Sequence, residues 1–241
     1  MSKLWFFGDS YIADLSHIIE NTSWTHLVMN AFPDYEAENL GKTCSSLDYL
    51  YYIYNDKRSE FKQGDVVILT LTALHRKFLN TEKRKITPSF MNSGFILREG
   101  KSEFVEENHE YYGFFVSELF NDDAELAKLD LFLDALQYDV LSKGIKIVVL
   151  PIEKKALGTK EHLIMGTSSG MWLKDVSRME IEKRFGKNLR NGYYLHSPVK
   201  EYDHKLANHL TPENNKILAQ KVINALNNND KTIDLSSGWD I

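Results

Sequence analysis

Three short apolar segments constrain the fold of this chain more than any other feature. Residues 3–7, 66–71 and 145–150 are almost continuously apolar, and Gly8 and Pro151 close the first and the last of them. Runs of this kind are typical of strands that are buried on both faces of a parallel sheet. Segments with helical spacing lie between the runs. Strands that alternate with helices predict a three-layer α/β/α fold, in which a small parallel sheet carries helices on both faces.

The remaining elements are predicted from spacing and from turn residues. A weaker strand is expected at 35–40, where Gly41 ends it, and Pro212 marks the first turn of the last helix. Helical spacing predicts helices at residues 11–19, 24–32, 45–54, 174–185 and 211–226, and a helix-rich region over 111–141 in which a new helix is capped at 121–123.

The length of the chain, 241 residues, fits a single domain, and we expect one α/β unit over residues 1–241. Residues 77–108 are polar and rich in lysine and glutamate. This stretch is too long for an ordinary connection, so we interpret it as an inserted lid or loop region. Residues 152–174 are expected to be irregular, because they contain three glycines and because 162–165 makes a poor strand.

Charge and cysteine content exclude several classes of protein. The chain has 29 basic and 34 acidic residues and a formal net charge of −5, which argues against a dedicated nucleic-acid binder. Cys44 is the only cysteine, so an internal disulfide and a multi-cysteine zinc site are both excluded. The eight histidines lack metal-ligand spacing and no phosphate-binding glycine motif occurs, so neither a metal nor an organic cofactor is expected.

The sequence contains no recognisable targeting segment. No stretch approaches the roughly 20 apolar residues that a membrane span needs. The apolar run at residues 4–7 stops at Gly8, short of the roughly 7–15 residues of a signal-peptide core. These features predict a cytoplasmic protein without a membrane span, and no feature predicts an oligomeric state.

Two segments at opposite ends of the chain could carry chemistry. Active sites in parallel sheets lie beyond the C-terminal ends of the strands, and Gly8-Asp9-Ser10 directly follows the first strand. Backbone N–H groups at the start of a helix could stabilise an oxyanion formed when Ser10 attacks a carbonyl, although Ser10 could instead be a simple N-cap. His209 lies on a loop before the last helix, where it could act as a general base or be an ordinary surface residue.

Together these segments resemble the SGNH, or GDSL-like, hydrolase family. The first block of that family is a strand followed by Gly-Asp-Ser, and Ser10 matches its nucleophile. The last block is a histidine, a polar turn and a final helix. Here His209 is followed by such a turn, the helix reaches Ala219 at the matching place, and Asn214 stands where the family usually has glycine. The resemblance implies a flavodoxin-like fold, Ser10 as nucleophile, His209 as its base, and no cofactor.

The resemblance also implies an oxyanion hole, with the backbone N–H groups of Ser10 and Cys44 as donors. Cys44 occupies the position of the family's second-block glycine, and Gly41 lies earlier. The third block normally supplies an asparagine side chain, which is missing after residues 66–71, so Thr72 is the expected third donor. Removal of one donor typically costs about 10²–10³ in rate, so weak or altered activity is expected.

Two further residues follow Thr72 and could replace the missing donor, namely His75 and Arg76. The Thr-x-x-x-Arg ending that Thr72 and Arg76 form resembles phage-encoded members of the family. For a phage-encoded protein, association with the virion is the alternative to a purely cytoplasmic location.

The acid of the expected triad departs from the family pattern. The family carries aspartate three residues before the histidine, but that position here is Leu206. Asp203 is the nearest upstream carboxylate and is our candidate for the residue that orients His209. The alternative is that Glu201 pairs with His204 and that His204 is the base.

The sequence also contains a competing motif and a tyrosine cluster. Residues 166–170 fit the Gly-x-Ser-x-Gly nucleophile elbow with Ser168 as nucleophile, but an elbow requires a good strand before it. The tyrosines within 49–54 are mainly expected to pack a helix, although their hydroxyls could face the site.

The resemblance implies a serine esterase or acyl hydrolase that cleaves carboxylic or O-acetyl esters of a small molecule or a glycan. Two alternatives use the same scaffold. One is an acyltransferase with a hydroxyl acceptor, and the other is a carbohydrate- or ligand-binding module that has lost its chemistry.

Overall fold

The computed structural model describes residues 1–13, 23–42, 45–72, 74, 79–81, 84–88, 95–98, 101–104, 121–152, 160–168, 172–173, 176, 179 and 210–240. For the segments between 79 and 104 it describes the backbone alone.

The centre of the molecule is a six-stranded sheet with the strand order β10-β9-β8-β3-β1-β2. Every neighbouring pair in this sheet is parallel. The parallel α/β fold predicted from the apolar runs is therefore confirmed. The strands are β1 (Lys3–Phe7), β2 (Glu36–Asn39), β3 (Val66–Leu71), β8 (Lys146–Pro151), β9 (Ile164–Thr167) and β10 (Thr232–Asp234).

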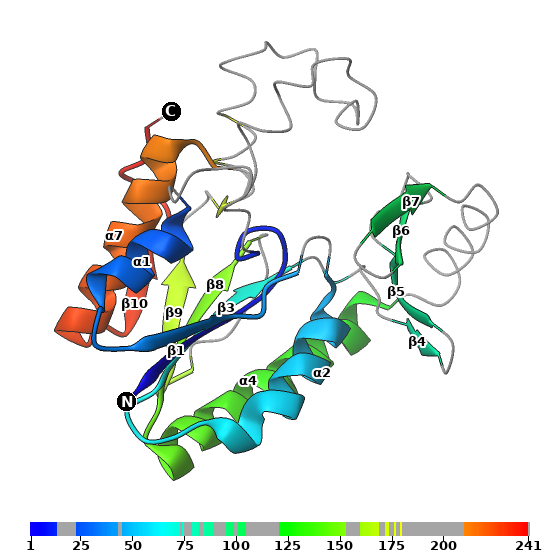
Figure 1. Ribbon diagram of the computed structural model, residues 1–241, viewed down its shortest axis with the longest axis horizontal. Helices are drawn as coiled ribbons and strands as arrows, with labels where there is room; N and C mark the ends of the chain where they lie inside the picture. Colours follow the sequence, from blue (N-terminus) through cyan, green and yellow to red (C-terminus); the bar gives the residue numbers. More distant parts are fainter. Residues whose placement is uncertain are drawn as a thin grey trace.

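In the described part of the chain, four helices cover the two faces of the sheet, α1 and α7 on one side and α2 and α4 on the other (Figure 1). Residues of β1 alternate between the two layers: Leu4 and Phe6 belong to the core under α1 and α7, whereas Trp5 and Phe7 belong to the core under α2 and α4. The helices are α1 (Trp24–Ala31), α2 (Leu47–Lys57), α4 (Asp122–Lys143) and α7 (Pro212–Asn228), with a 3₁₀ turn η1 (Arg58–Glu60) after α2.

The helix ends follow the capping residues in the sequence. Asn121 caps α4 by accepting a hydrogen bond from the Ala124 N–H, and Gly144 ends the helix in a left-handed conformation with φ 65°. Thr211 caps α7, with Pro212 in the first turn as predicted. In the described part of the chain, no helix has the length and apolar character required to cross a bilayer.

An ion pair with a fully buried carboxylate joins η1 to α4, and Tyr54 of α2 also binds that carboxylate. The fully buried carboxylate of Asp139 accepts hydrogen bonds from Arg58 Nε at 2.7 Å and from the Tyr54 hydroxyl at 2.9 Å. Burial and the neighbouring Asp139 charge raise the pKa of Tyr54. Tyr51 packs against Phe132 with ring centroids 4.5 Å apart. These tyrosines therefore serve helix packing, as the sequence mainly predicted.

Two strands of the sheet differ from the sequence prediction. Residues 164–167, which we expected to be irregular, form β9, and its pairing aligns Ile164 with Val148 of β8. The polar tail after α7 supplies β10, which pairs with β9. Both strands are short, so their pairing with neighbouring strands, rather than their local pattern, determines their structure.

The inserted region contains a second, antiparallel sheet with the strand order β4-β5-β6-β7. Figure 1 shows it apart from the central sheet, and the chain reaches it from the end of β3. Its role as a lid stays a prediction. Its strands are β4 (Leu79–Thr81), β5 (Arg84–Pro88), β6 (Phe95–Arg98) and β7 (Lys101–Phe104).

Candidate active site

Ser10 and Thr72 lie at the point where the strand order reverses. β1 is placed between β2 and β3, so the chain crosses from one half of the sheet to the other between these strands. Ligand sites in doubly wound sheets form at such a switch point. Phe7 is aligned with Leu69, and Ser10 and Thr72 each follow three residues later. Both side chains are buried, with exposed fractions of 6% and 2%.

Asp9 caps the turn that contains Ser10. Its carboxylate oxygen Oδ1 accepts a hydrogen bond from the Tyr11 N–H at 3.1 Å. Its carbonyl oxygen accepts hydrogen bonds from the N–H groups of Ile12 at 3.0 Å and Ala13 at 2.9 Å. These are the bonds of an N-cap residue, so Asp9 performs the capping role that the sequence left open for Ser10. Ser10 is thus the first residue of a helical turn.

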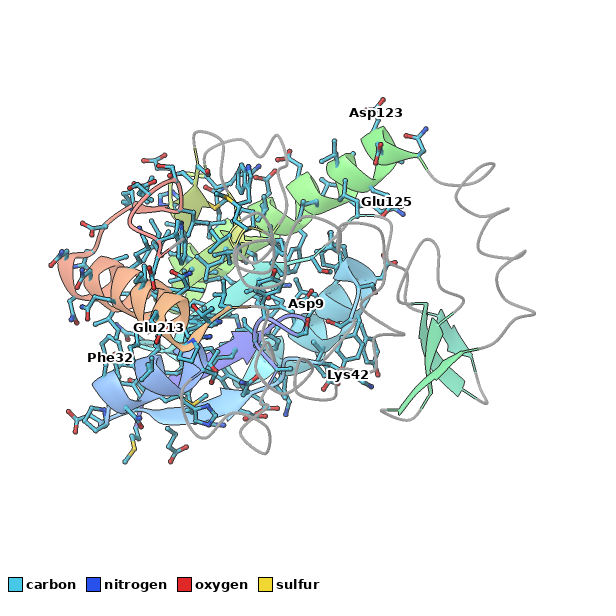
Figure 2. All side chains as sticks on the ribbon, turned by 90° about the horizontal axis from the view of Figure 1, so that it is seen from above. Asp9, Phe32, Lys42, Asp123, Glu125 and Glu213 are labelled. Atoms are coloured by element: carbon cyan, nitrogen blue, oxygen red, sulfur yellow. The ribbon has the colours of Figure 1, made fainter. Side chains whose placement is uncertain are left out.

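The loop after β2 is bonded to the same turn. The Gly8 carbonyl accepts hydrogen bonds from the Lys42 N–H at 2.9 Å and from the Ser45 hydroxyl at 2.9 Å. Figure 2 shows Asp9 at the end of β1 and Lys42 beyond the end of β2. Lys42 and Ser45 flank residues 43–44, so the segment on either side of Cys44 is attached two residues before Ser10.

Asn39 and Gly41 hold the far side of the turn. Asn39 Nδ2 donates to the Ile12 carbonyl at 2.7 Å, and Asn39 Oδ1 accepts from the Gly41 N–H at 2.9 Å. A Cβ atom at Gly41 would overlap the Ile12 side chain and would lie 2.7 Å from the Ala13 nitrogen. Glycine is therefore required here by the close approach of the two backbones.

Trp24 and Asn215 hold the turn from the layer formed by α1 and α7. Trp24 Nε1 donates to the Tyr11 carbonyl at 2.6 Å, and the Trp24 N–H donates to Asn215 Oδ1 at 2.9 Å. Asn215 Nδ2 donates to the carbonyl oxygens of Leu210 at 2.9 Å and Thr211 at 3.0 Å. We call this set of bonds the Trp24–Asn215 clamp. Sequence reasoning missed both residues, because bonds between distant residues have no local signal.

Asn214 has a different partner from Asn215. Its Nδ2 donates to the Asp240 carbonyl at 3.0 Å, and its Oδ1 accepts from the Asp240 N–H at 2.8 Å. The amide therefore binds the C-terminal segment to the start of α7, which explains why a side chain is useful at this position.

Several predicted site residues lie outside the described residues, so their roles stay predictions. They are Cys44, His75, Arg76, Glu201, Asp203, His204 and His209. Leu210, the residue after His209, is described and is buried in the core that also contains Tyr11. Within the described ranges, no group of three or more His, Cys, Asp or Glu side chains could hold a metal ion.

Ser168 lies at a different place from Ser10. The strand before it is real, which corrects our expectation of a poor strand, and Ser168 directly follows β9. However, β8 and β3 separate β9 from β1. Strands are spaced by about 4.8 Å, so three spacings place the two strands roughly 14 Å apart. Ser10 and Ser168 therefore mark two separate candidate positions for a nucleophile.

Comparisons with known proteins add little to this description. No family model matches the chain, and no curated protein sequence is similar to it. Among solved structures, the X-ray crystal structure of protein YxiM from Bacillus subtilis is similar over 76% of this chain, with 12% sequence identity and a TM-score of 0.38. The matched region spans 41% of that protein. A likeness this loose carries no functional information, so the fold assignment rests on the strand order itself.

Proposed function

We propose that this protein is a serine hydrolase that cleaves carboxylic or O-acetyl esters, with Ser10 as the nucleophile. The observation that carries the proposal is the position of Ser10, which is buried in the first helical turn after β1 at the switch point of the sheet. The N–H groups of the residues that follow Ser10 are bonded to Asp9, so the donor that we propose in this turn for the developing negative charge is the N–H of Ser10 itself.

The direction of α7 supports His209 as the base. Lys146, the first residue of β8, donates to Asn229 Oδ1 at 2.6 Å just past the end of α7. The helix therefore ends at the N-terminal edge of the sheet and begins at the C-terminal edge, where Ser10 lies. His209 precedes Leu210, whose carbonyl Asn215 holds at that edge.

The proposed reaction follows the order of serine hydrolases. The Ser10 hydroxyl attacks the ester carbonyl while His209 accepts its proton, and Asp203 orients the imidazole. The N–H groups of Ser10 and Cys44, together with the Thr72 hydroxyl, receive the oxyanion. The alcohol leaves with the proton from His209. Water, activated by His209, then attacks the acyl-enzyme and releases the acid.

The proposal is tested by hydrolysis of p-nitrophenyl acetate by the full chain and two variants. Ser10→Ala should abolish turnover and leave the melting temperature almost unchanged, because Asp9 supplies the cap of the turn. Ser168→Ala should retain turnover within threefold of wild type. The reverse pattern would assign the nucleophile to Ser168, and a folded wild-type protein without turnover would favour the binding module.

A second measurement separates hydrolase from transferase. The acyl group released from p-nitrophenyl acetate is measured as acetate and as acetyl ester in the presence of glycerol. The proposed hydrolase yields acetate as the main product. Predominant transfer to glycerol would overturn the hydrolytic assignment and would leave Ser10 as the nucleophile that carries the acyl group.

A further inference from the structure

The Trp24–Asn215 clamp connects the residue after Ser10 with the residue after His209. One end is the Tyr11 carbonyl, which accepts from the Trp24 ring N–H. The other end is the Leu210 carbonyl, which accepts from Asn215 Nδ2. The bond between the Trp24 N–H and Asn215 Oδ1 joins the two halves. The clamp thus links two segments that are far apart in the sequence and that both lie at the C-terminal edge of the sheet.

The groups in the clamp are buried and depend on one another. Trp24 is 0% exposed and Asn215 is 1% exposed. The Trp24 N–H belongs to the first turn of α1, where no partner within the helix is available, and Asn215 supplies that partner from another helix. Loss of the Asn215 side chain would remove the bond to the buried Trp24 N–H, and loss of the Trp24 ring would remove the bond to the Tyr11 carbonyl, so the spacing of the two segments depends on both residues.

Asparagine is suited to this position because its amide both accepts and donates. Oδ1 accepts from Trp24, while Nδ2 donates to two carbonyl oxygens at the start of α7. Aspartate has the same size and would keep the acceptor, but it would place a second oxygen against those carbonyls. The Asn215→Asp change therefore removes the two bonds to the carbonyl oxygens at the start of α7 without a change in side-chain volume.

We propose that Trp24 and Asn215 are positioning residues, which set the spacing between the Ser10 turn and the segment that carries His209. The inference rests on the proposed function of Ser10 and His209. Catalysis between two groups is sensitive to such spacing, since a misplacement of about 1 Å can cost roughly 100-fold in rate. Neither residue contacts substrate in this scheme, so the cost falls on kcat and not on substrate binding.

The adjacent asparagine provides a matched control. Asn214 is also fully buried near the start of α7, and the bonds described above join its amide to the backbone of Asp240. Asn214→Asp makes the same chemical change at the neighbouring position, with the same helix dipole and a similar loss of one donor. We expect Asn215→Asp to lower kcat about 100-fold with KM within threefold, and Asn214→Asp to change kcat less than threefold.

Two further measurements extend the test. Trp24→Phe removes the bond from the Trp24 ring N–H to the Tyr11 carbonyl. Its effect on kcat should be less than additive with that of Asn215→Asp, because both variants act on one chain of bonds. In hydrogen–deuterium exchange, the amides of Ile12 and Ala13 report on the Ser10 turn, since both donate to the Asp9 carbonyl. They should exchange faster in Asn215→Asp than in Asn214→Asp.

The outcomes distinguish this inference from the proposed function. Labelling of Ser10 by a fluorophosphonate probe establishes that the wild-type serine is reactive. If wild type labels and hydrolyses while Asn215→Asp and Trp24→Phe keep kcat within threefold, the positioning role is overturned and the hydrolase remains. If wild type neither labels nor hydrolyses, the hydrolase fails, and the positioning role fails with it. If Asn215→Asp does not fold, Trp24→Phe provides the test. A lower kcat with an unchanged KM supports the positioning role, and an unchanged kcat overturns it.

Discussion

Gly8 lies so close to Thr70 that a Cβ atom at position 8 would overlap the Thr70 hydroxyl. The Thr70 oxygen is buried and has no hydrogen-bond partner among the residues that the structure describes. β1 therefore passes β3 at close range immediately before the chain turns to Asp9 and Ser10, and this approach fixes where the candidate nucleophile leaves the sheet.

The first prediction is that Gly8→Ala is destabilising and that Thr70→Ala partly suppresses it. Forced overpacking of this kind costs roughly 1–3 kcal/mol. Without the Thr70 hydroxyl, the nearest atoms to the new Cβ are Thr70 Cβ at 3.2 Å and Thr70 N at 3.3 Å, and the Gly8 φ of 159° stays unfavourable for a side chain, so the suppression is partial. Urea unfolding of the two single variants and the double variant measures the effect. Additive losses in the double variant would contradict the proposed contact.

The second prediction concerns the acid of the triad. If Asp203 orients His209, Asp203→Asn should lower kcat for p-nitrophenyl acetate steeply, by up to about 10⁴-fold as in complete triads. His209→Ala should abolish turnover. A kcat for Asp203→Asn within threefold of wild type, with His209→Ala inactive, would show that the serine and histidine act as a dyad.

The third prediction is a pH dependence of stability at the end of β10. The Asp234 carboxylate accepts hydrogen bonds from the Ser236 hydroxyl and N–H and from the Ser237 hydroxyl, and these bonds lower its pKa from 3.8 to about 2. A lowered pKa stabilises the folded state above the unfolded value, and this contribution is lost as the pH falls from about 4 to about 2.

Asp234→Asn removes this contribution. The melting temperature of the variant should be below that of wild type above pH 4, and the difference should shrink toward pH 2. Thermal unfolding followed by circular dichroism across this range provides the measurement. A difference that stays constant with pH would mean that the serine bonds do not depend on the charge of Asp234.

The fourth prediction concerns the ion pair between Arg58 of η1 and Asp139 of α4, in which the Asp139 carboxylate is fully buried and Arg58 is partly exposed. Arg58→Met leaves the fully buried Asp139 carboxylate with the Tyr54 hydroxyl as its remaining bond among those described above. Breaking such a pair from one side costs roughly 3 kcal/mol, whereas replacing both partners with apolar residues costs much less. Urea unfolding should therefore show partial recovery when Asp139→Leu is added to Arg58→Met. A further loss in the double variant would contradict this account.

The sequence predicted the elements whose pattern is local. Residues 66–71 are apolar at almost every position because β3 is buried on both faces, and this is visible without a structure. Thr211 and Pro212 likewise mark the start of α7. By contrast, β9 and β10 have four and three residues, and their strand character comes from pairing with distant neighbours. The polar insertion contains strands for which the sequence gave us no periodic signal.

The same distinction holds at the candidate site. Ser10 was placed at the end of the first strand from the residues beside it, and the structure agrees. Asn215 was missed because an asparagine in a polar helix start is usually exposed, and only the packing of α7 against α1 buries its amide. Ser10 was considered as the N-cap of the turn, and the structure gives that role to the adjacent Asp9.

The hydrogen bond between Trp24 and Asn215 spans 191 positions in the sequence. Translation proceeds from the N-terminus, so Ser10 and Trp24 are synthesised well before Asn215. A nascent or truncated chain that stops before residue 215 contains the serine but lacks the Asn215 half of the clamp. Under the proposed function, the full set of bonds around the nucleophile therefore forms only after residue 215 has been added.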